Sequence, residues 1–143
     1  MMANRPEVGA QGGSQVAAQV VGIGTDMIRQ QRVAAVYQRK GERFVQRILT
    51  AAEQQLWQQR GGSENFLAKQ YAAKEAIAKA LGTGIAKGVG FQQIEVLRDA
   101  HGAPLVRLYD AAEQRLFQLG GQTALLSLTD DGGLILAFAV LSR

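Results

Sequence analysis

Apolar and polar positions follow two different periods along the chain, and together they predict a mixture of strands and helices. The β-branched run Val20–Asp26 is typical of a buried strand that ends in a carboxylate, and a helical pattern follows over Met27–Arg39. Thr50-Ala51-Ala52-Glu53 has the spacing of a capping box, which predicts a helix that continues to about Gln59. We therefore expect Asp26 at the end of a strand, directly before a helix.

The longest predicted helix occupies the middle of the chain. Ser63 is expected to cap it, its apolar positions continue to about Leu81, and Gly82 is expected to end it. Glu75 and Lys79 are four residues apart on this helix, so both side chains should lie on the same face.

The second half of the chain shows shorter runs separated by turn residues. They predict a hairpin from Phe91–Arg98 and Pro104–Leu108, a helix over Tyr109–Leu119, and a final hairpin from Thr123–Leu128 and Leu134–Leu141. Helices combined with hairpins favour an α+β fold in which an antiparallel sheet packs against helices. The pattern contains no internal repeat.

The length and composition of the chain fit one domain. It has 143 residues, of which 47% are hydrophobic and 20% charged, and we expect residues 20–143 to form a single domain. Residues 1–19 are rich in Gly, Gln, Ala and Ser and lack the pattern of a signal peptide, so we interpret them as a flexible leader. No apolar run approaches the roughly 18–20 residues that span a membrane, so we expect a cytoplasmic protein without a membrane partner.

The choice of metal-binding residues is narrow. The chain has no cysteine, which excludes disulfides, thiolate catalysis and thiol-ligated metal centres. His101 is the single histidine, so zinc sites with several histidines are also excluded. Any metal must therefore be held mainly by oxygen atoms.

Positive charge gathers in one stretch of the chain. The net charge is +4, and the excess is concentrated in Arg29, Arg32, Arg39, Lys40, Arg43 and Arg47. Such a run is either a solvated helix face or a patch for an anionic partner, and charge alone does not separate the two.

Asp26 and Glu75 could together supply two hard oxygen ligands for Mg²⁺, whose other positions water and phosphate would fill. Lys79 could neutralise a phosphate, or it could form an intrahelical salt bridge with Glu75. Gly82-Thr83-Gly84 could present backbone N–H groups and a hydroxyl to phosphate, or could simply end the helix. Residue spacing leaves these alternatives open.

Two ordered motifs carry a resemblance to a known family. Val21-Gly22-Ile23-Gly24-Thr25-Asp26 and the segment Phe66–Gly84, which contains Ala73-Lys74-Glu75-Ala76, closely resemble the bacterial holo-acyl-carrier-protein synthases. The similarity extends from about Val20 to the C-terminus. It implies a 4'-phosphopantetheinyl transferase-like fold, a trimer with active sites between subunits, and magnesium-dependent transfer of 4'-phosphopantetheine from coenzyme A to a serine of acyl carrier protein in fatty acid biosynthesis.

The resemblance also implies roles for individual residues. Asp26 and Glu75 match the residues that bind Mg²⁺, Lys79 matches a lysine near the coenzyme A phosphates, and Gly82-Thr83-Gly84 matches the loop beside the nucleotide end. These make Asp26, Glu75 and Lys79 the expected catalytic group, with Glu75 as a hypothetical proton acceptor. The expected docking residues for acyl carrier protein are Arg32, supported by Arg29, Arg39 and Arg43.

One position departs from the family pattern. Many members have a histidine where this chain has Leu125, and any role of that histidine must be absent or covered elsewhere. We expect His101 to be a solvent-facing turn residue without a catalytic role. The last strands, over Leu134–Val140, are candidates for contacts between subunits.

Two other classes of function compete with this interpretation. A coenzyme A- or nucleotide-binding module without turnover would use the same loop and cations. A nucleic-acid-binding domain would explain the basic charge, but the aromatic residues are too thinly spread to form a stacking cluster, and we do not expect a nucleic-acid partner.

Overall fold

The computed structural model describes residues 19–143, so almost all of the predicted leader at residues 1–19 lies outside the described residues. The predicted α+β class is confirmed. The elements in chain order are β1 (Val20–Arg29), α1 (Gln30–Lys40), α2 (Glu42–Ile48), α3 (Ala51–Gln59), α4 (Glu64–Ala80), the 3-10 turn η1 (Phe91–Gln93), β2 (Ile94–Arg98), β3 (Pro104–Leu108), α5 (Asp110–Gln118), β4 (Thr123–Asp131) and β5 (Leu134–Ser142).

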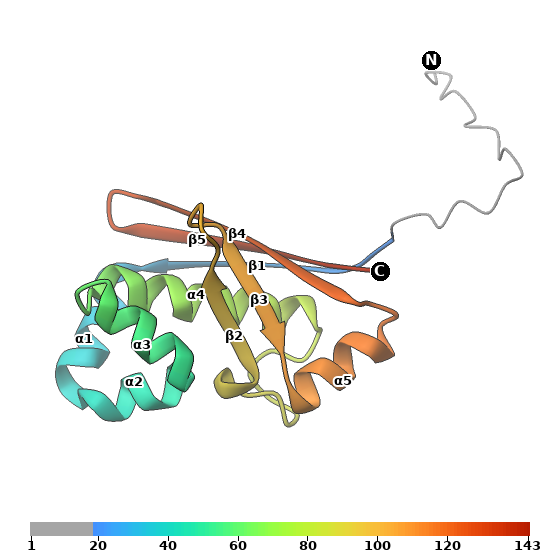
Figure 1. Cartoon of the computed structure of the whole chain (residues 1–143), viewed down its shortest axis with the longest axis horizontal. Helices are drawn as coiled ribbons and strands as arrows, with labels where there is room; N and C mark the ends of the chain where they lie inside the picture. The colour runs from blue at the N-terminus through green and yellow to red at the C-terminus, as the bar shows by residue number, and fades with distance from the viewer. Residues whose placement is uncertain (1–18) are drawn as a thin grey trace, which may run out of the picture.

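A three-stranded antiparallel sheet forms one layer, with β5 between β1 and β4. The long helix α4 packs along β1 and β5. Figure 1 shows α4, the bundle of α1 to α3, and α5 on one side of this sheet. The β2–β3 hairpin overlaps the sheet in this view, and β3 contacts β4. The hydrophobic core therefore lies between α4 and one face of the sheet.

The start of the chain differs from its prediction. The helix expected from Met27 begins only at Gln30, because Met27, Ile28 and Arg29 still pair with β5 as part of β1. The short helix α2 was not predicted. It follows Gly41, whose φ of 58° interrupts the helical path, and it turns Phe44 towards the core.

Two further predictions about local structure have different outcomes. The capping box at Thr50 and Glu53 is confirmed, because each side chain binds the backbone N–H of the other residue. The hairpin is also present, but Phe91–Gln93 forms the turn η1 rather than the start of the strand.

Within residues 19–143, no element covers one apolar face of the sheet. The prediction that β1 is buried holds for alternate residues only, since the side chains of Ile23 and Met27 are 64% and 66% exposed. Four more exposed apolar residues lie on β4 and β5. We call this surface the open sheet face; it comprises Ile23, Met27, Leu125, Leu134, Leu136 and Phe138.

A fully buried ion pair joins three parts of the fold. Lys74 on α4 lies 2.6 Å from the Glu53 carboxylate of α3, and its ammonium also donates to the Phe91 carbonyl at 3.0 Å. Glu53 accepts a further hydrogen bond from the Val96 N–H of β2 at 3.0 Å. Because buried charges are costly unless fully paired, this network specifies how α3 and β2 sit on α4.

Candidate active site

Helix α4 approaches β1 unusually closely because β1 has glycine at two facing positions. A Cβ atom on Gly24 would collide with the Ala76 carbonyl oxygen, and one on Gly22 would collide with the Ala80 carbonyl oxygen. The glycines therefore have a packing role rather than a turn role. Their contact brings the end of β1 next to the middle of α4.

This approach places Asp26 of β1 beside Lys79 of α4. The Lys79 ammonium lies 3.0 Å from Asp26 Oδ1 and donates to the Thr25 carbonyl at 3.1 Å. The Lys79 side chain is 52% exposed, while that of Asp26 is only 16% exposed. The intrahelical salt bridge considered for Lys79 and Glu75 is not formed, since Lys79 pairs across elements with Asp26 instead.

Glu75 completes a pair of like charges at this position. Partial burial raises the pKa of Glu75 above its usual value, and the neighbouring carboxylate of Asp26 raises it further. Lys79 and a hydrogen bond from Tyr71 oppose this shift in pKa. Two carboxylates that repel one another form a site that a cation would stabilise.

The two carboxylates fit Mg²⁺ better than a metal ion that takes all of its ligands from protein side chains. Within residues 19–143, no group of three or more His, Cys, Asp or Glu side chains could hold a metal ion. Asp26 and Glu75 supply two carboxylates, and Mg²⁺ commonly binds through one or two carboxylates while keeping water and phosphate oxygens as its other ligands. These two residues could therefore hold Mg²⁺.

The glycine loop after α4 does not offer the free backbone donors that were expected. The N–H of Gly82 donates to the Lys79 carbonyl at 2.9 Å, and the N–H groups of Thr83 and Gly84 donate to the Ala78 carbonyl at 3.3 and 3.0 Å. Of the two alternatives left open for Gly82-Thr83-Gly84, the backbone N–H groups fit the second, because they cap the end of the helix.

Cationic side chains beside this loop, rather than its backbone N–H groups, could bind an anion. Gly82 and Thr83 line an open hollow of about 350 Å³ together with Lys87 and Arg115. Arg115 also donates to the Leu81 carbonyl at 2.9 Å, which holds its guanidinium beside the loop. The Thr83 hydroxyl donates to the Gly84 carbonyl at 2.8 Å, so the cationic side chains of Lys87 and Arg115 are the groups here that could contact a phosphate.

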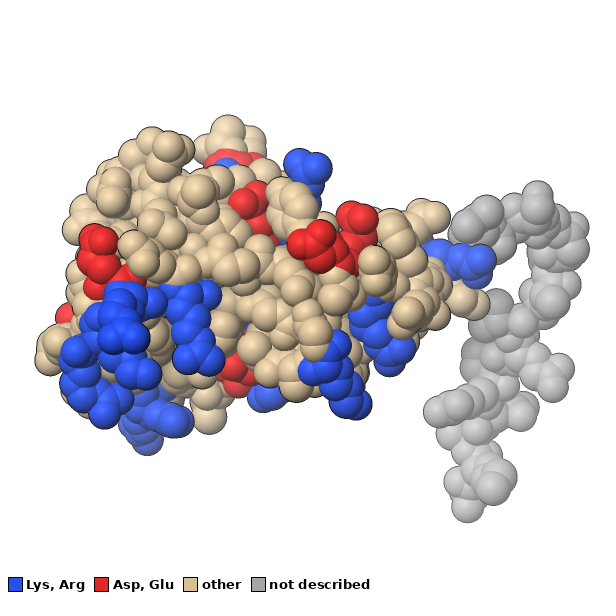
Figure 2. All heavy atoms as spheres, turned by 90° about the horizontal axis from the view of Figure 1, so that it is seen from below, with Lys and Arg blue, Asp and Glu red and all other residues tan. Residues whose placement is uncertain are grey.

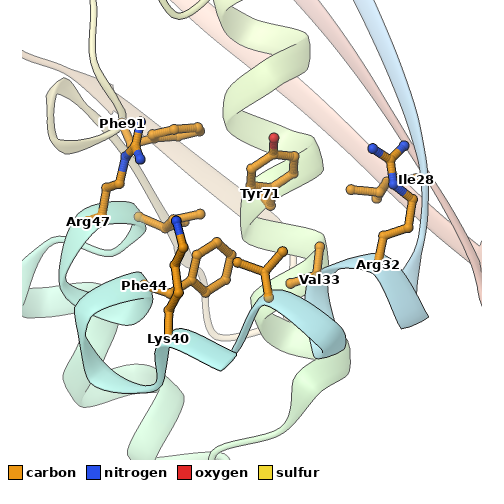
Figure 3. A pocket seen from close by; sticks show the side chains of 10 residues that line it. Ile28, Arg32, Val33, Lys40, Phe44, Arg47, Tyr71 and Phe91 are labelled. Atoms are coloured by element: carbon orange, nitrogen blue, oxygen red, sulfur yellow. The ribbon is translucent and has the colours of Figure 1, made fainter. Parts of the chain in front are cut away.

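A second hollow lies between α1, α2 and α4, and we call it the basic pocket. It has a volume of about 210 Å³, and its lining residues are Ile28, Arg32, Val33, Val36, Lys40, Phe44, Arg47, Ile48, Tyr71 and Phe91. Figure 3 shows Arg32 and Arg47 on opposite sides of the Tyr71 ring, above the apolar Val33 and Phe44. The pocket thus combines an apolar floor with a cationic rim.

The basic stretch of the sequence mostly surrounds this pocket. Arg39 and Arg43 line an adjoining hollow with Lys40, Phe44 and Arg47. Figure 2 shows Lys and Arg side chains gathered at one end of the molecule. Arg29 lines neither hollow, because strand alternation directs it away from the face on which Ile28 lies.

Tyr71 is the site residue that sequence reasoning missed. Its ring lines the basic pocket, and Glu75 lies four residues further along α4. Partial burial and the nearby charge of Glu75 raise the pKa of Tyr71. The i, i+4 spacing was visible in the sequence, but a tyrosine among apolar helix positions is more typical of core packing.

His101 and Leu125 lie on parts of the fold other than the site of Asp26, Glu75 and Lys79. His101 is exposed in the β2–β3 turn, where its N–H donates to the Asp99 carboxylate at 2.8 Å, and the expectation of a solvent-facing turn residue is confirmed. Leu125 lies on the open sheet face.

Comparisons with known proteins agree on one family. Residues 22–139 match the model of the 4'-phosphopantetheinyl transferase superfamily. A holo-[acyl-carrier-protein] synthase from Shewanella amazonensis is 48% identical over 122 residues, covering 85% of this chain and 98% of that protein. One from Photorhabdus laumondii is 44% identical, covering 87% and 98%.

A solved structure shows the same similarity in three dimensions. The crystal structure of the holo-[acyl-carrier-protein] synthase from Neisseria meningitidis aligns with a TM-score of 0.80 at 38% identity, covering 87% of this chain and all of that one. The Helicobacter pylori enzyme, solved in complex with coenzyme A, aligns with a TM-score of 0.74 at 28% identity, covering 83% and 98%.

The raised pKa of Glu75 predicts a pH-dependent gain in stability for Glu75→Gln. Between the ordinary carboxyl pKa and the raised one, the folded chain binds more protons than the unfolded chain, so stability falls as pH rises through this window. In metal-free buffer, Glu75→Gln should therefore melt at a higher temperature than the native chain at pH 8, and the difference should disappear near pH 4.5.

Thermal denaturation in EDTA at both pH values measures this difference. Glu113→Gln, which changes an exposed carboxylate on α5, is the matched control and should not raise the melting temperature. A Glu75→Gln variant that is less stable than the native chain at pH 8 would contradict the repulsion between Asp26 and Glu75.

Proposed function

The chain belongs to the 4'-phosphopantetheinyl transferase superfamily, and from this premise we propose that it is a holo-acyl-carrier-protein synthase. In the proposed reaction, a serine oxygen of apo acyl carrier protein forms a bond to the β-phosphorus of coenzyme A. The pyrophosphate bond breaks, and adenosine 3',5'-bisphosphate leaves. We place the reaction in cytoplasmic fatty acid biosynthesis, where acyl carrier proteins act.

The single observation that carries this proposal is the meeting of Asp26 and Glu75 next to an exposed lysine. Asp26 and Glu75 would hold Mg²⁺, which when bound would neutralise the pyrophosphate and the leaving oxygen. Glu75 would also accept the serine proton, directly or through water, and its raised pKa suits a proton acceptor.

Lys79 and the hollow after α4 would bind the coenzyme A phosphates. The Lys79 ammonium is half exposed, and its long side chain can reach a phosphate beside Asp26. Gly82, Thr83 and Gly84 would contact the nucleotide end, with Lys87 and Arg115 supplying the positive charge that the loop's backbone lacks.

The basic pocket would dock the acyl carrier protein. Acidic surfaces with apolar side chains among them match a pocket that has an apolar floor and a cationic rim. Arg32 is the main candidate, because it lines the pocket beside Ile28 (Figure 3); Arg39 and Arg43 extend the positive surface. Arg29 has less support, since it lines neither hollow.

The open sheet face would form the contact between subunits of a homotrimer. Its exposed apolar residues lie on adjacent strands, with Phe138 paired to Thr25 and Leu136 paired to Met27. A contiguous apolar patch of this kind is typical of a protein interface. Closed C3 symmetry would bury it on every subunit.

Transfer is tested by mass spectrometry of an apo acyl carrier protein after incubation with the chain, coenzyme A and magnesium. We expect the carrier to gain the mass of one phosphopantetheine. Asp26→Asn and Glu75→Gln should each lower kcat/KM about a hundredfold or more, because each removes charge that faces the phosphates. Glu113→Gln should keep the native rate.

Other results would identify a different function. Metal-independent coenzyme A binding without any mass gain would indicate a silent binding module. Binding to DNA or RNA with a steep salt dependence and no mass gain would indicate a nucleic-acid-binding domain. Full turnover by Glu75→Gln at saturating magnesium would remove Glu75 from the proposed catalytic group.

Carrier docking predicts a selective effect of charge reversal at Arg32. Arg32→Glu should raise the apparent KM for the carrier about tenfold and reduce the sensitivity of the rate to salt, with the KM for coenzyme A unchanged. Arg29→Glu is the matched control and should have a smaller effect, because Arg29 lies outside the pocket. Equal increases in both KM values for Arg32→Glu would argue against docking at this pocket.

Trimer formation predicts that a charge on the open sheet face will separate the subunits. Sedimentation equilibrium should give three times the 15.4 kDa mass of the chain for the native protein and a lower mass for Phe138→Glu. Phe117→Glu changes a phenylalanine on α5 that is also exposed, and it should leave the mass unchanged. A native protein that sediments as a monomer would contradict the proposal.

A further inference from the structure

Asp26 and Lys79 form an ion pair whose two partners differ in their freedom to move. The Asp26 side chain is only 16% exposed, and its strand is fixed on α4 by the backbone contact at Gly24. The Lys79 side chain is 52% exposed and reaches the carboxylate through a flexible chain of methylene groups. Lys79 can therefore leave Asp26 by rotating into solvent, without disturbing the packing of α4 on β1.

The ammonium of Lys79 lies against the oxygen atoms that a metal ion on Asp26 would use. It is 3.0 Å from Asp26 Oδ1 and donates to the Thr25 carbonyl at 3.1 Å. Carboxylate and carbonyl oxygens are also the ligands that suit Mg²⁺ and Mn²⁺. A divalent cation on Asp26 and the ammonium of Lys79 would thus compete for the same negative charge.

The charges of the site favour an exchange between the two cations. Lys79 pairs with one carboxylate, while Glu75, four residues earlier on the same face of α4, forms no salt bridge with any residue in 19–143. A divalent cation held by Asp26 and Glu75 would balance both carboxylates. The ammonium of Lys79 would then be repelled by that cation and attracted to the nearest anion, which in the proposed reaction is a phosphate of coenzyme A.

We propose that Lys79 is a movable counter-ion: it pairs with Asp26 until a divalent cation takes that carboxylate, and its ammonium then turns to a coenzyme A phosphate. This proposal rests on the proposed function for the identity of the cation and of the phosphate. It couples the two binding events, because Lys79 becomes available to the phosphate when it leaves Asp26. Each ligand should therefore tighten the binding of the other through Lys79.

The proposal is tested by measuring metal binding in the absence of coenzyme A. Mn²⁺ is titrated by calorimetry into the native chain and into Lys79→Met. Lys79→Met should bind Mn²⁺ about three- to tenfold more tightly, because no ion pair has to be broken first. Lys69→Met is the matched control. It removes a lysine of the same helix that lies 3.4 Å from Asp130, and it should change the affinity by less than about twofold.

A second measurement follows the ammonium itself in a chain whose lysine side chains are isotope-labelled. NMR reports how fast the Lys79 ammonium protons exchange with water. The exchange should become faster on saturation with Mg²⁺ and slower again when coenzyme A is added, because the ammonium passes from Asp26 to water and then to phosphate. The Lys69 protons should keep their exchange rate. This measurement uses the native sequence, so it does not depend on the folding of a variant.

Two results would overturn the proposal. Equal Mn²⁺ affinities of Lys79→Met and the native chain would show that the ammonium does not compete for Asp26. An unchanged exchange rate of the Lys79 protons at saturating Mg²⁺ would show that the ion pair persists. A chain that behaves as expected in both measurements, but leaves apo acyl carrier protein unmodified, would remove the proposed reaction and support the exchange of cations at Asp26.

Discussion

The close contact between β1 and α4 is the constraint on which the rest of the molecule depends. Gly22 and Gly24 leave no side chain between the strand and the carbonyl groups of Ala76 and Ala80, so strand and helix touch through their backbones. Asp26 follows this contact by two residues along β1. It therefore meets side chains from α4 at a distance set by backbone packing, which is stiffer than any contact between flexible side chains.

Adjacent residues of α4 serve different purposes because helix geometry directs them to different faces. Lys74 is fully buried and held by Glu53, so it links the helical bundle and the β2–β3 hairpin to α4. Glu75 is partly exposed, and its pKa is raised by partial burial and by the charge of Asp26. The buried network thus provides a rigid base for the carboxylate pair, and its charges are satisfied internally so that they do not compete with those of the site.

The basic pocket and the open sheet face differ in chemistry. The basic pocket joins positive charge to an apolar floor, which suits an acidic partner that binds and leaves, because charge mainly governs association rate and salt sensitivity. The open sheet face is mostly apolar, with Arg29 and Asp131 paired to Leu134 at one end, and a mostly apolar surface suits a lasting contact between identical subunits. Both surfaces include residues of β1, but Ile28 of the pocket and Met27 of the open sheet face lie on opposite faces of that strand, so one partner need not displace the other.

The sequence by itself predicted the α+β class and the extents of α3, α4 and β3, because periodicity and caps are local features. Its two motifs also pointed to Asp26, Glu75 and Lys79 as candidate site residues. Only the tertiary structure decided which groups meet. In the tertiary structure Lys79 pairs with Asp26 rather than with Glu75. The N–H groups of Gly82-Thr83-Gly84 cap the end of α4, and Arg29 lies outside the basic pocket. The tertiary structure also revealed Tyr71 as a neighbour of both sites. These outcomes depend on how α4 lies against β1. Contacts between segments that are distant in the sequence leave no regular residue spacing, so a single sequence does not predict them.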